Sequence, residues 1–173
     1  EVAGTVGNVE SPETPTPAEM EADRATSLFE EGLRLLDKKR HAAAADLFTQ
    51  ALEADPTLAQ AHANRGRCRN ALKNAAGALE DIDRAIELDP KNPEFYLERG
   101  YLLHYRQEYR AAANDFARAS ALGLRTAVVH NNLGYAYLLA GEGDLALQEI
   151  LRAIALDPAH PDSYSSLGEL YRR

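Results

Sequence analysis

One stretch of sequence decides the fold: residues 127–160 read AVVHNNLGYAYLLAGEGDLALQEILRAIALDPAH. Its small residues Gly134, Ala146 and Ala153 suit places where two helices approach closely, because a larger side chain would push the backbones apart. The pair Asp157-Pro158 ends the stretch, since proline disfavours helix at the residue before it. The stretch therefore predicts a helix, a short turn and a second helix packed against the first.

The same small residues recur every 34 positions along the chain. The recurring positions are Gly32, Gly66, Gly100, Gly134 and Gly168; Ala44, Ala78, Ala112 and Ala146; and Ala51, Ala85, Ala119 and Ala153. Four residues after each alanine of the first set stands a large apolar residue, namely Phe48, Ile82, Phe116 or Ile150. Glycine inside a helix costs about 1 kcal/mol relative to alanine, so five in register indicate close helix packing.

This pattern predicts nine helices, near 17–38, 41–54, 57–72, 75–88, 93–106, 109–122, 126–140, 143–156 and 161–172. Thr16-Pro17-Ala18-Glu19 has the pattern of a capping box, with proline at the first helical position. The first helix is therefore expected to begin before the repeats and to extend outward from them as an N-terminal cap.

The spacings resemble the tetratricopeptide repeat, with residues 127–160 as the best copy: His130, Leu133-Gly134, Tyr137, Ala146, Ile150, Ala153 and Pro158. The resemblance covers residues 25–173 and implies an all-α fold, a right-handed superhelical solenoid of antiparallel helix pairs. We expect an array over 17–173, made of repeats 25–58, 59–92, 93–126 and 127–160 and a half repeat 161–173. Residues 1–16, rich in Pro, Thr and acids, are expected to be a disordered acidic linker. Departures from the pattern are local, such as Leu124 in place of proline.

Two arginines stand before a repeat glycine, where leucine is usual. Arg65 and Arg99 are each followed 16 residues later by an aspartate, Asp81 and Asp115, whereas the other repeats lack both partners. This pairing predicts a structural Arg–Asp ion pair between the two helices of a repeat.

The resemblance implies a concave groove formed by the first helix of each pair, in which a peptide segment or a partner helix of another protein binds. The expected binding residues are Asn64, Arg67, Tyr101, Tyr105, Asn131, Asn132 and Tyr135. Tyrosine offers apolar area with a polar tip, and asparagine can bond a peptide backbone as donor and acceptor. The alternative is that each is an ordinary solvated residue. One subgroup of the family binds the C-terminal carboxylate of heat-shock chaperones, but here acids such as Glu94 and Glu98 stand where cations are required.

Charge and motifs exclude several other functions. Of the net charge of −8, residues 1–24 carry −5, so the repeats are nearly balanced and nucleic acid is not the expected partner. The five histidines have no cysteine or carboxylate at metal-ligand spacing, and His62 and His130, at one repeat position, are expected to serve packing. No nucleotide-binding or hydrolase motif is present, so we expect no catalytic site, cofactor or metal. No apolar stretch is long enough to span a bilayer.

A second hypothesis is a structural assembly subunit that uses the end of the array. Residues 161–173 present an apolar stripe of Tyr164, Leu167, Leu170 and Tyr171, through which the chain would form a homo-oligomer. The single Cys68 cannot form an internal disulfide and is compatible with a reducing compartment, which favours the cytoplasm. The alternative is the bacterial periplasm, because a flexible linker before a repeat array suits a periplasmic lipoprotein and a tether to an upstream domain equally.

Overall fold

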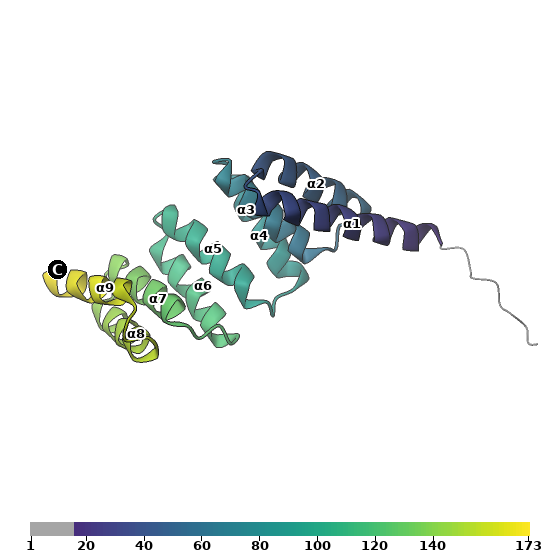
Figure 1. Ribbon diagram of the computed structural model, residues 1–173. Coiled ribbons are helices and arrows are strands. Elements are labelled where there is room, and N and C mark those ends of the chain that lie inside the picture. Colours follow the sequence, from purple (N-terminus) through teal and green to yellow (C-terminus); the bar gives the residue numbers. More distant parts are fainter. Residues whose placement is uncertain (1–15) are drawn as a thin grey trace, which may run out of the picture.

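The computed structural model describes residues 16–173, which form nine α-helices and no strand (Figure 1). The helices are α1 (Pro17–Asp37), α2 (His41–Ala54), α3 (Ala59–Ala71), α4 (Ala75–Leu88), α5 (Pro93–Tyr105), α6 (Tyr109–Ala121), α7 (Ala127–Leu139), α8 (Gly143–Leu156) and α9 (Pro161–Arg172).

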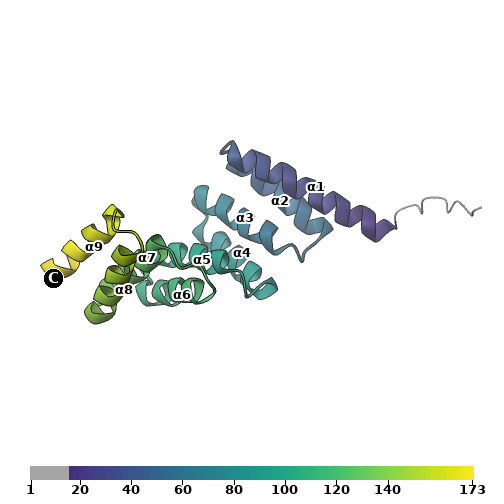
Figure 2. The ribbon, with the colours of Figure 1, turned by 60° about the horizontal axis from the view of Figure 1, so that its bottom comes forward.

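Neighbouring helices pack in pairs, α1 with α2, α3 with α4, α5 with α6 and α7 with α8. Each pair then packs on the next through its second helix, and α9 follows at the end of the array. The odd-numbered helices follow one another along one side, and α4, α6 and α8 lie on the other (Figure 2). The predicted all-α solenoid of helix pairs is confirmed.

The ends of α2, α4, α8 and α9 are as predicted, and the other helices differ from the prediction by one or two residues at one or both ends. The largest change is in α3, which begins at Ala59 rather than at 57. The Asp55 Oδ1 atom accepts hydrogen bonds from the Thr57 backbone N–H and hydroxyl, at 2.9 and 2.6 Å, and these bonds hold residues 55–57 in a turn.

The capping box at the start of α1 is present. The Glu19 N–H donates to the Thr16 hydroxyl oxygen at 3.3 Å, and the Thr16 N–H donates to the Glu19 carboxylate at 2.7 Å. Residues 17–24 are exposed, and this end of α1 projects beyond α2 (Figure 1). Apart from Thr16, the predicted linker 1–16 lies outside the described residues.

The repeat glycines lie where a second helix comes close. A Cβ atom added to Gly100 would lie 2.6 Å from the buried Phe116 ring, and one added to Gly134 would lie 2.7 Å from Ile150 Cγ1. Gly32 and Gly66 meet α2 and α4 in the same way. The large apolar residues therefore occupy the space that each glycine leaves, as the spacing predicted.

The predicted Arg–Asp pairs are confirmed. Arg65 Nη2 lies 2.7 Å from Asp81 Oδ1, and Arg99 Nε lies 2.7 Å from Asp115 Oδ2. Arg69 from α3 also reaches Asp81, at 2.9 Å.

In the fourth pair of helices, a buried histidine of α7, and not an arginine, pairs with the buried carboxylate of α8. His130 Nδ1 lies 2.7 Å from Glu149 Oε2, so this residue has a polar role besides the packing role predicted for it. At the equivalent position His62 Nδ1 is 3.6 Å from Asp81 Oδ1. Each of these repeats thus joins its two helices through one buried carboxylate.

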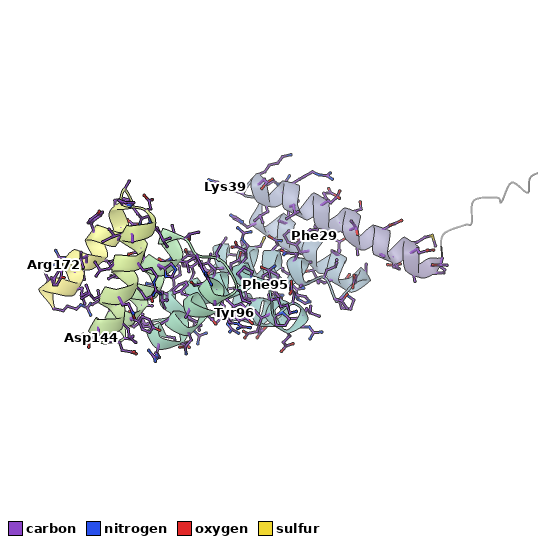
Figure 3. The ribbon with its side chains drawn as sticks, turned by 90° about the horizontal axis from the view of Figure 1, so that it is seen from below. Phe29, Lys39, Phe95, Tyr96, Asp144 and Arg172 are labelled. Atoms are coloured by element: carbon purple, nitrogen blue, oxygen red, sulfur yellow. The ribbon has the colours of Figure 1, made fainter. Side chains whose placement is uncertain are left out.

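Helix α5 forms the middle of the array. Phe95 and Tyr96 both come from its first turn (Figure 3). Phe95 is buried in one core cluster with Ala78, Ile82 and Ala85 of α4. The Tyr96 hydroxyl donates to the Pro90 carbonyl oxygen at 3.1 Å and so ties α5 to the preceding loop.

Candidate functional site on the odd-numbered helices

Two rows of side chains run along the odd-numbered helices at the 34-residue spacing of the repeat. The first row is Asn64, Glu98, Asn132 and Ser166, and the second row is Arg67, Tyr101, Tyr135 and Glu169. Members of the two rows on one helix are three residues apart, so they lie on one helix face. The rows place equivalent side chains of α3, α5, α7 and α9 along one surface.

Second-row residues reach the first-row residue of the next helix, 31 positions later. Arg67 Nε of α3 lies 3.2 Å from Glu98 Oε1 of α5. Asn132 Nδ2 of α7 donates to the Tyr101 hydroxyl of α5 at 2.8 Å. Helices α3, α5 and α7 are thus linked in series by polar side chains.

Between α3 and α5 the surface is hollowed into a recess of about 360 Å³, which we call the first recess. It is lined by Gly66, Arg67, Asn70, Ile82, Glu94, Leu97, Glu98, Tyr101 and Leu102. Its apolar walls are leucine and isoleucine side chains, and its polar groups include members of both rows as well as Asn70 and Glu94. A mixed lining of this kind suits one side chain with an apolar stem and a polar end.

Glu98 is the most perturbed group of this recess. Its Oε2 atom is buried without a hydrogen-bond partner, whereas its Oε1 atom meets Arg67. Burial raises the pKa of Glu98 to about 7, against the lowering effect of Arg67, and Glu94 raises it further. Burial also raises the pKa of the Tyr101 hydroxyl, which stays neutral at pH 7 and accepts from Asn132.

A second recess, of about 380 Å³, lies between α7 and α9 and is lined by Asn131, Tyr135, Asp162, Ser165, Ser166, Glu169 and Arg172. Arg172 is near the C-terminal end of the array (Figure 3). Most of this lining is equivalent to that of the first recess, 68 residues later, with Asp162 at the position of Glu94 and Ser166 at that of Glu98. The two recesses therefore lie at equivalent places in the repeat but are lined by different side chains.

Between α5 and α7, side chains of the two helices meet directly. Besides the Tyr101–Asn132 hydrogen bond, the His104 and Tyr135 rings lie 5.9 Å apart between centroids. Burial lowers the pKa of His104, so its ring is neutral at pH 7. This polar and aromatic contact separates the first recess from the second.

The structure divides the seven predicted groove residues among these features. Arg67 and Tyr101 line the first recess, Asn131 and Tyr135 line the second, and Asn132 joins the central contact.

The side-chain amides of the predicted asparagines differ in whether their hydrogen-bonding groups are already paired within the protein. Asn64 is buried, donating to the Gln60 carbonyl oxygen at 2.8 Å and accepting from Arg67 at 3.3 Å. Asn131 is buried too, but its Oδ1 atom has no partner. Tyr105 is the opposite case, 77% exposed and lining neither recess.

The predicted cluster omits Glu98, which the structure places in the lining of the first recess. The sequence contains a signal for it, because Glu98 stands midway between Asn64 and Asn132 at the 34-residue spacing. Its burial and its unpaired oxygen depend on α3 lying alongside α5, which composition does not reveal.

Among residues 16–173, no group of three or more histidine, cysteine, aspartate or glutamate side chains is arranged to hold a metal ion. Within the same range, none of the helices combines the length and the apolar character that crossing a bilayer requires.

Comparison with known proteins gives the family. Three family models described as tetratricopeptide repeat match residues 29–93, 82–115 and 127–160. Among curated proteins no sequence match was found.

Solved structures with the same fold are numerous. A crystal structure of MamA protein is 25% identical, with a TM-score of 0.80 over 87% of this chain and 82% of that chain. YrrB, described as a TPR protein with an unusual peptide-binding site, is 23% identical, with a TM-score of 0.75 over 87% of this chain and 77% of that one. The first TPR domain of Spaghetti (RPAP3), bound to the HSP90 peptide SRMEEVD, is 24% identical, with a TM-score of 0.67 over 69% of this chain and 95% of that one. With the family models, the 34-residue spacing and the stacked helix pairs in agreement, the chain belongs to the tetratricopeptide-repeat family.

Proposed function

We propose that the chain is a protein–protein interaction scaffold that binds a segment of a partner protein, extended or helical, along the odd-numbered helices. The observation that carries the proposal is the pair of equivalent recesses on either side of the Tyr101–Asn132 contact. A segment lying along this surface would place one side chain in each recess. The proposed binding residues are Asn64, Arg67, Tyr101, Tyr105, Asn131, Asn132 and Tyr135, with Glu98 added.

Two structural neighbours support this reading by their descriptions, since YrrB has a peptide-binding site and the Spaghetti domain holds an HSP90 peptide. The chaperone peptide itself is not the ligand that we propose, because Glu94 and Glu98 would repel its carboxylates. The proposed role is that of a scaffold without catalysis, and it requires no cofactor.

The test is capture of a partner by the intact array and by a variant with a weakened groove. We choose Tyr101→Phe with Asn132→Ala, which removes the 2.8 Å hydrogen bond but keeps the ring that packs on Phe116. A partner held by the parent and by an outer-face control, Leu151→Ser, should be lost or weakened with the groove variant. Equal capture by all three proteins would contradict groove binding, provided that circular dichroism shows all three folded.

An alternative function, self-assembly through α9, keeps only part of the predicted apolar stripe. Leu167 and Leu170 pack against the core of α7 and α8, whereas Tyr164 and Tyr171 are exposed. Tyr164 is 48% exposed although Tyr96, its equivalent in α5, is 9% exposed, and Tyr171 is 74% exposed. Gly168 has no atom within 4 Å of an added Cβ, whereas the four equivalent glycines each meet the next helix. Within residues 16–173 no helix covers this face of α9 (Figure 1).

Sedimentation velocity over a range of protein concentrations tests the alternative. Self-assembly predicts a dimer or larger species that Tyr164→Ser with Tyr171→Ser abolishes. A strict monomer at several hundred micromolar (roughly a hundredfold above a micromolar Kd) would contradict it.

A further inference from the structure

The first recess contains a carboxylate oxygen that no protein group satisfies. Glu98 Oε2 is buried and accepts no hydrogen bond, while Oε1 of the same group lies 3.2 Å from Arg67 Nε. A buried acceptor without a donor is unfavourable, and a buried charge without full pairing more so. Glu98 therefore lacks one donor, or one positive charge, that a ligand can bring.

The remainder of the recess suits the stem of a long side chain. Ile82 is 1% exposed, and Leu97 and Leu102 form the wall next to Glu98. Methylene groups placed against these residues would be removed from water, as happens with the stems of lysine and arginine.

The charge of the recess is unbalanced in favour of a cation. Two carboxylates, Glu94 and Glu98, line it with one guanidinium, Arg67. Arg67 pairs with Glu98 through only one oxygen, and Glu94 is exposed at the rim with no ion pair among the described residues.

We propose that the first recess binds a lysine or arginine side chain of the partner segment, with its stem against Leu97 and Leu102 and its cationic head on the Glu98 carboxyl. Entry of the head requires the Glu98 carboxyl to turn toward the cavity, which exchanges an unpaired oxygen for a charge-assisted hydrogen bond. Glu94 at the rim adds attraction as the cation approaches. This inference rests on the proposed function, because it names one side chain of the segment that the groove would hold.

The second recess provides a comparison within the same molecule. There Ser165 and Ser166 replace Leu97 and Glu98, so its lining has neither the apolar wall nor the partly buried acid of the first recess. Its Glu169 is already paired with Arg172 at 2.8 Å and Arg173 at 3.2 Å, which lower the pKa of Glu169. The preference for a cation is therefore expected at the first recess and not at the second.

Selection from a random dodecapeptide library displayed on phage tests the inference, with the full chain as bait. The parent should select peptides with lysine or arginine at one aligned position. The same peptide with norleucine at that position should bind at least about tenfold more weakly, because it loses a hydrogen bond to a charged group, which typically contributes a factor of this size. Isothermal titration of the peptide pair measures this ratio.

Two neutralising variants locate the effect. Glu98→Gln should reduce the lysine-to-norleucine ratio to within about twofold, since the amide keeps the shape but loses the charge. Glu80→Gln, an exposed position on α4 outside both recesses, should leave the ratio unchanged.

The outcomes separate the inference from the function on which it rests. Peptides that bind the parent and are weakened by Tyr101→Phe with Asn132→Ala, but show no preference for a basic residue or keep it in Glu98→Gln, overturn the inference and leave the function standing. Failure to select any peptide, or peptides that the groove variant binds equally well, would contradict the function itself.

Discussion

Gly100 and Gly168 stand at the same position of the repeat but in opposite surroundings. A methyl group on Gly100 would lie 2.6 Å from the Phe116 ring, which is 1% exposed and has little room to move. A methyl group on Gly168 would meet no atom within 4 Å. The same substitution should therefore have opposite signs at the two sites.

We expect Gly100→Ala to destabilise the fold by about 1–2 kcal/mol, because overpacking outweighs the gain in helix propensity. Gly168→Ala should be neutral or stabilising by up to about 1 kcal/mol. Urea unfolding followed by circular dichroism measures both. If Gly100→Ala is as stable as the parent, the close approach of α5 and α6 is wrong.

Glu98 makes the stability of the folded protein depend on pH. Its pKa is raised to about 7 in the folded protein, mainly by burial, with Arg67 opposing and Glu94 adding to the shift. The folded state thus holds the proton more tightly than the unfolded chain, whose carboxyl titrates near 4.5. The stability from this group is complete below pH 4.5 and is lost as the pH rises to about 7.

The variant Glu98→Gln removes this titration. Relative to the parent, it should gain up to about 3 kcal/mol between pH 4.5 and pH 7.5, with solvent screening reducing the value. Urea unfolding of both proteins across this range measures the difference, in which titrations common to both cancel. Parallel pH profiles would mean that Glu98 ionises in the folded protein as it does in water.

Helix α4 carries two aspartates that differ in burial and in their ion pairs. Asp81 has a side chain only 3% exposed and pairs with Arg65 and Arg69 of α3. Asp83 is 54% exposed and pairs with Arg99 of the next repeat, which also holds Asp115. Loss of Asp81 leaves two partly buried guanidinium groups without their partner, whereas loss of Asp83 leaves Arg99 paired.

Asp81→Ala should therefore cost about 3 kcal/mol of unfolding free energy or more. Asp83→Ala, on the same helix and with the same change in helix propensity, should cost less than about 1 kcal/mol. Guanidinium chloride would screen these charges, so urea is the denaturant of choice. Similar losses for the two variants would show that the pair linking α3 and α4 contributes little.

For the whole molecule, a solenoid is stabilised only by contacts between neighbouring elements, so the ends are weaker than the middle. Helix α9 packs on α7 and α8 from one side, whereas its equivalent α5 packs on both α4 and α6. Amide hydrogen exchange in α9 should accordingly be faster than in α5 at micromolar concentration, as mass spectrometry of peptic fragments can show.

The same measurement at higher concentration separates the two proposed functions. Protection of α9 that rises with protein concentration would support assembly through Tyr164 and Tyr171. Protection of α9 equal to that of α5 in the dilute monomer would contradict the one-sided packing.

The sequence by itself determined the helices, their pairing and the contacts that repeat. The 34-residue spacing placed Gly100 against Phe116 and Arg99 against Asp115, because a regular array puts equivalent residues in equivalent surroundings. It also placed most of the candidate site residues on one side of the array, since helix position is read directly from the repeat.

Only the tertiary structure decided which of those residues are free to bind. Asn64 is of a residue type common in binding sites, but it uses its amide within α3. Glu98 has an unpaired oxygen because α3 and α5 together bury that atom. Burial and pairing depend on side chains from several helices at once, and a repeat pattern does not specify how each residue that departs from it is accommodated. The recess beside Glu98 arises from such departures, Arg67 and Glu98 among them, and so it became visible only in the packed array.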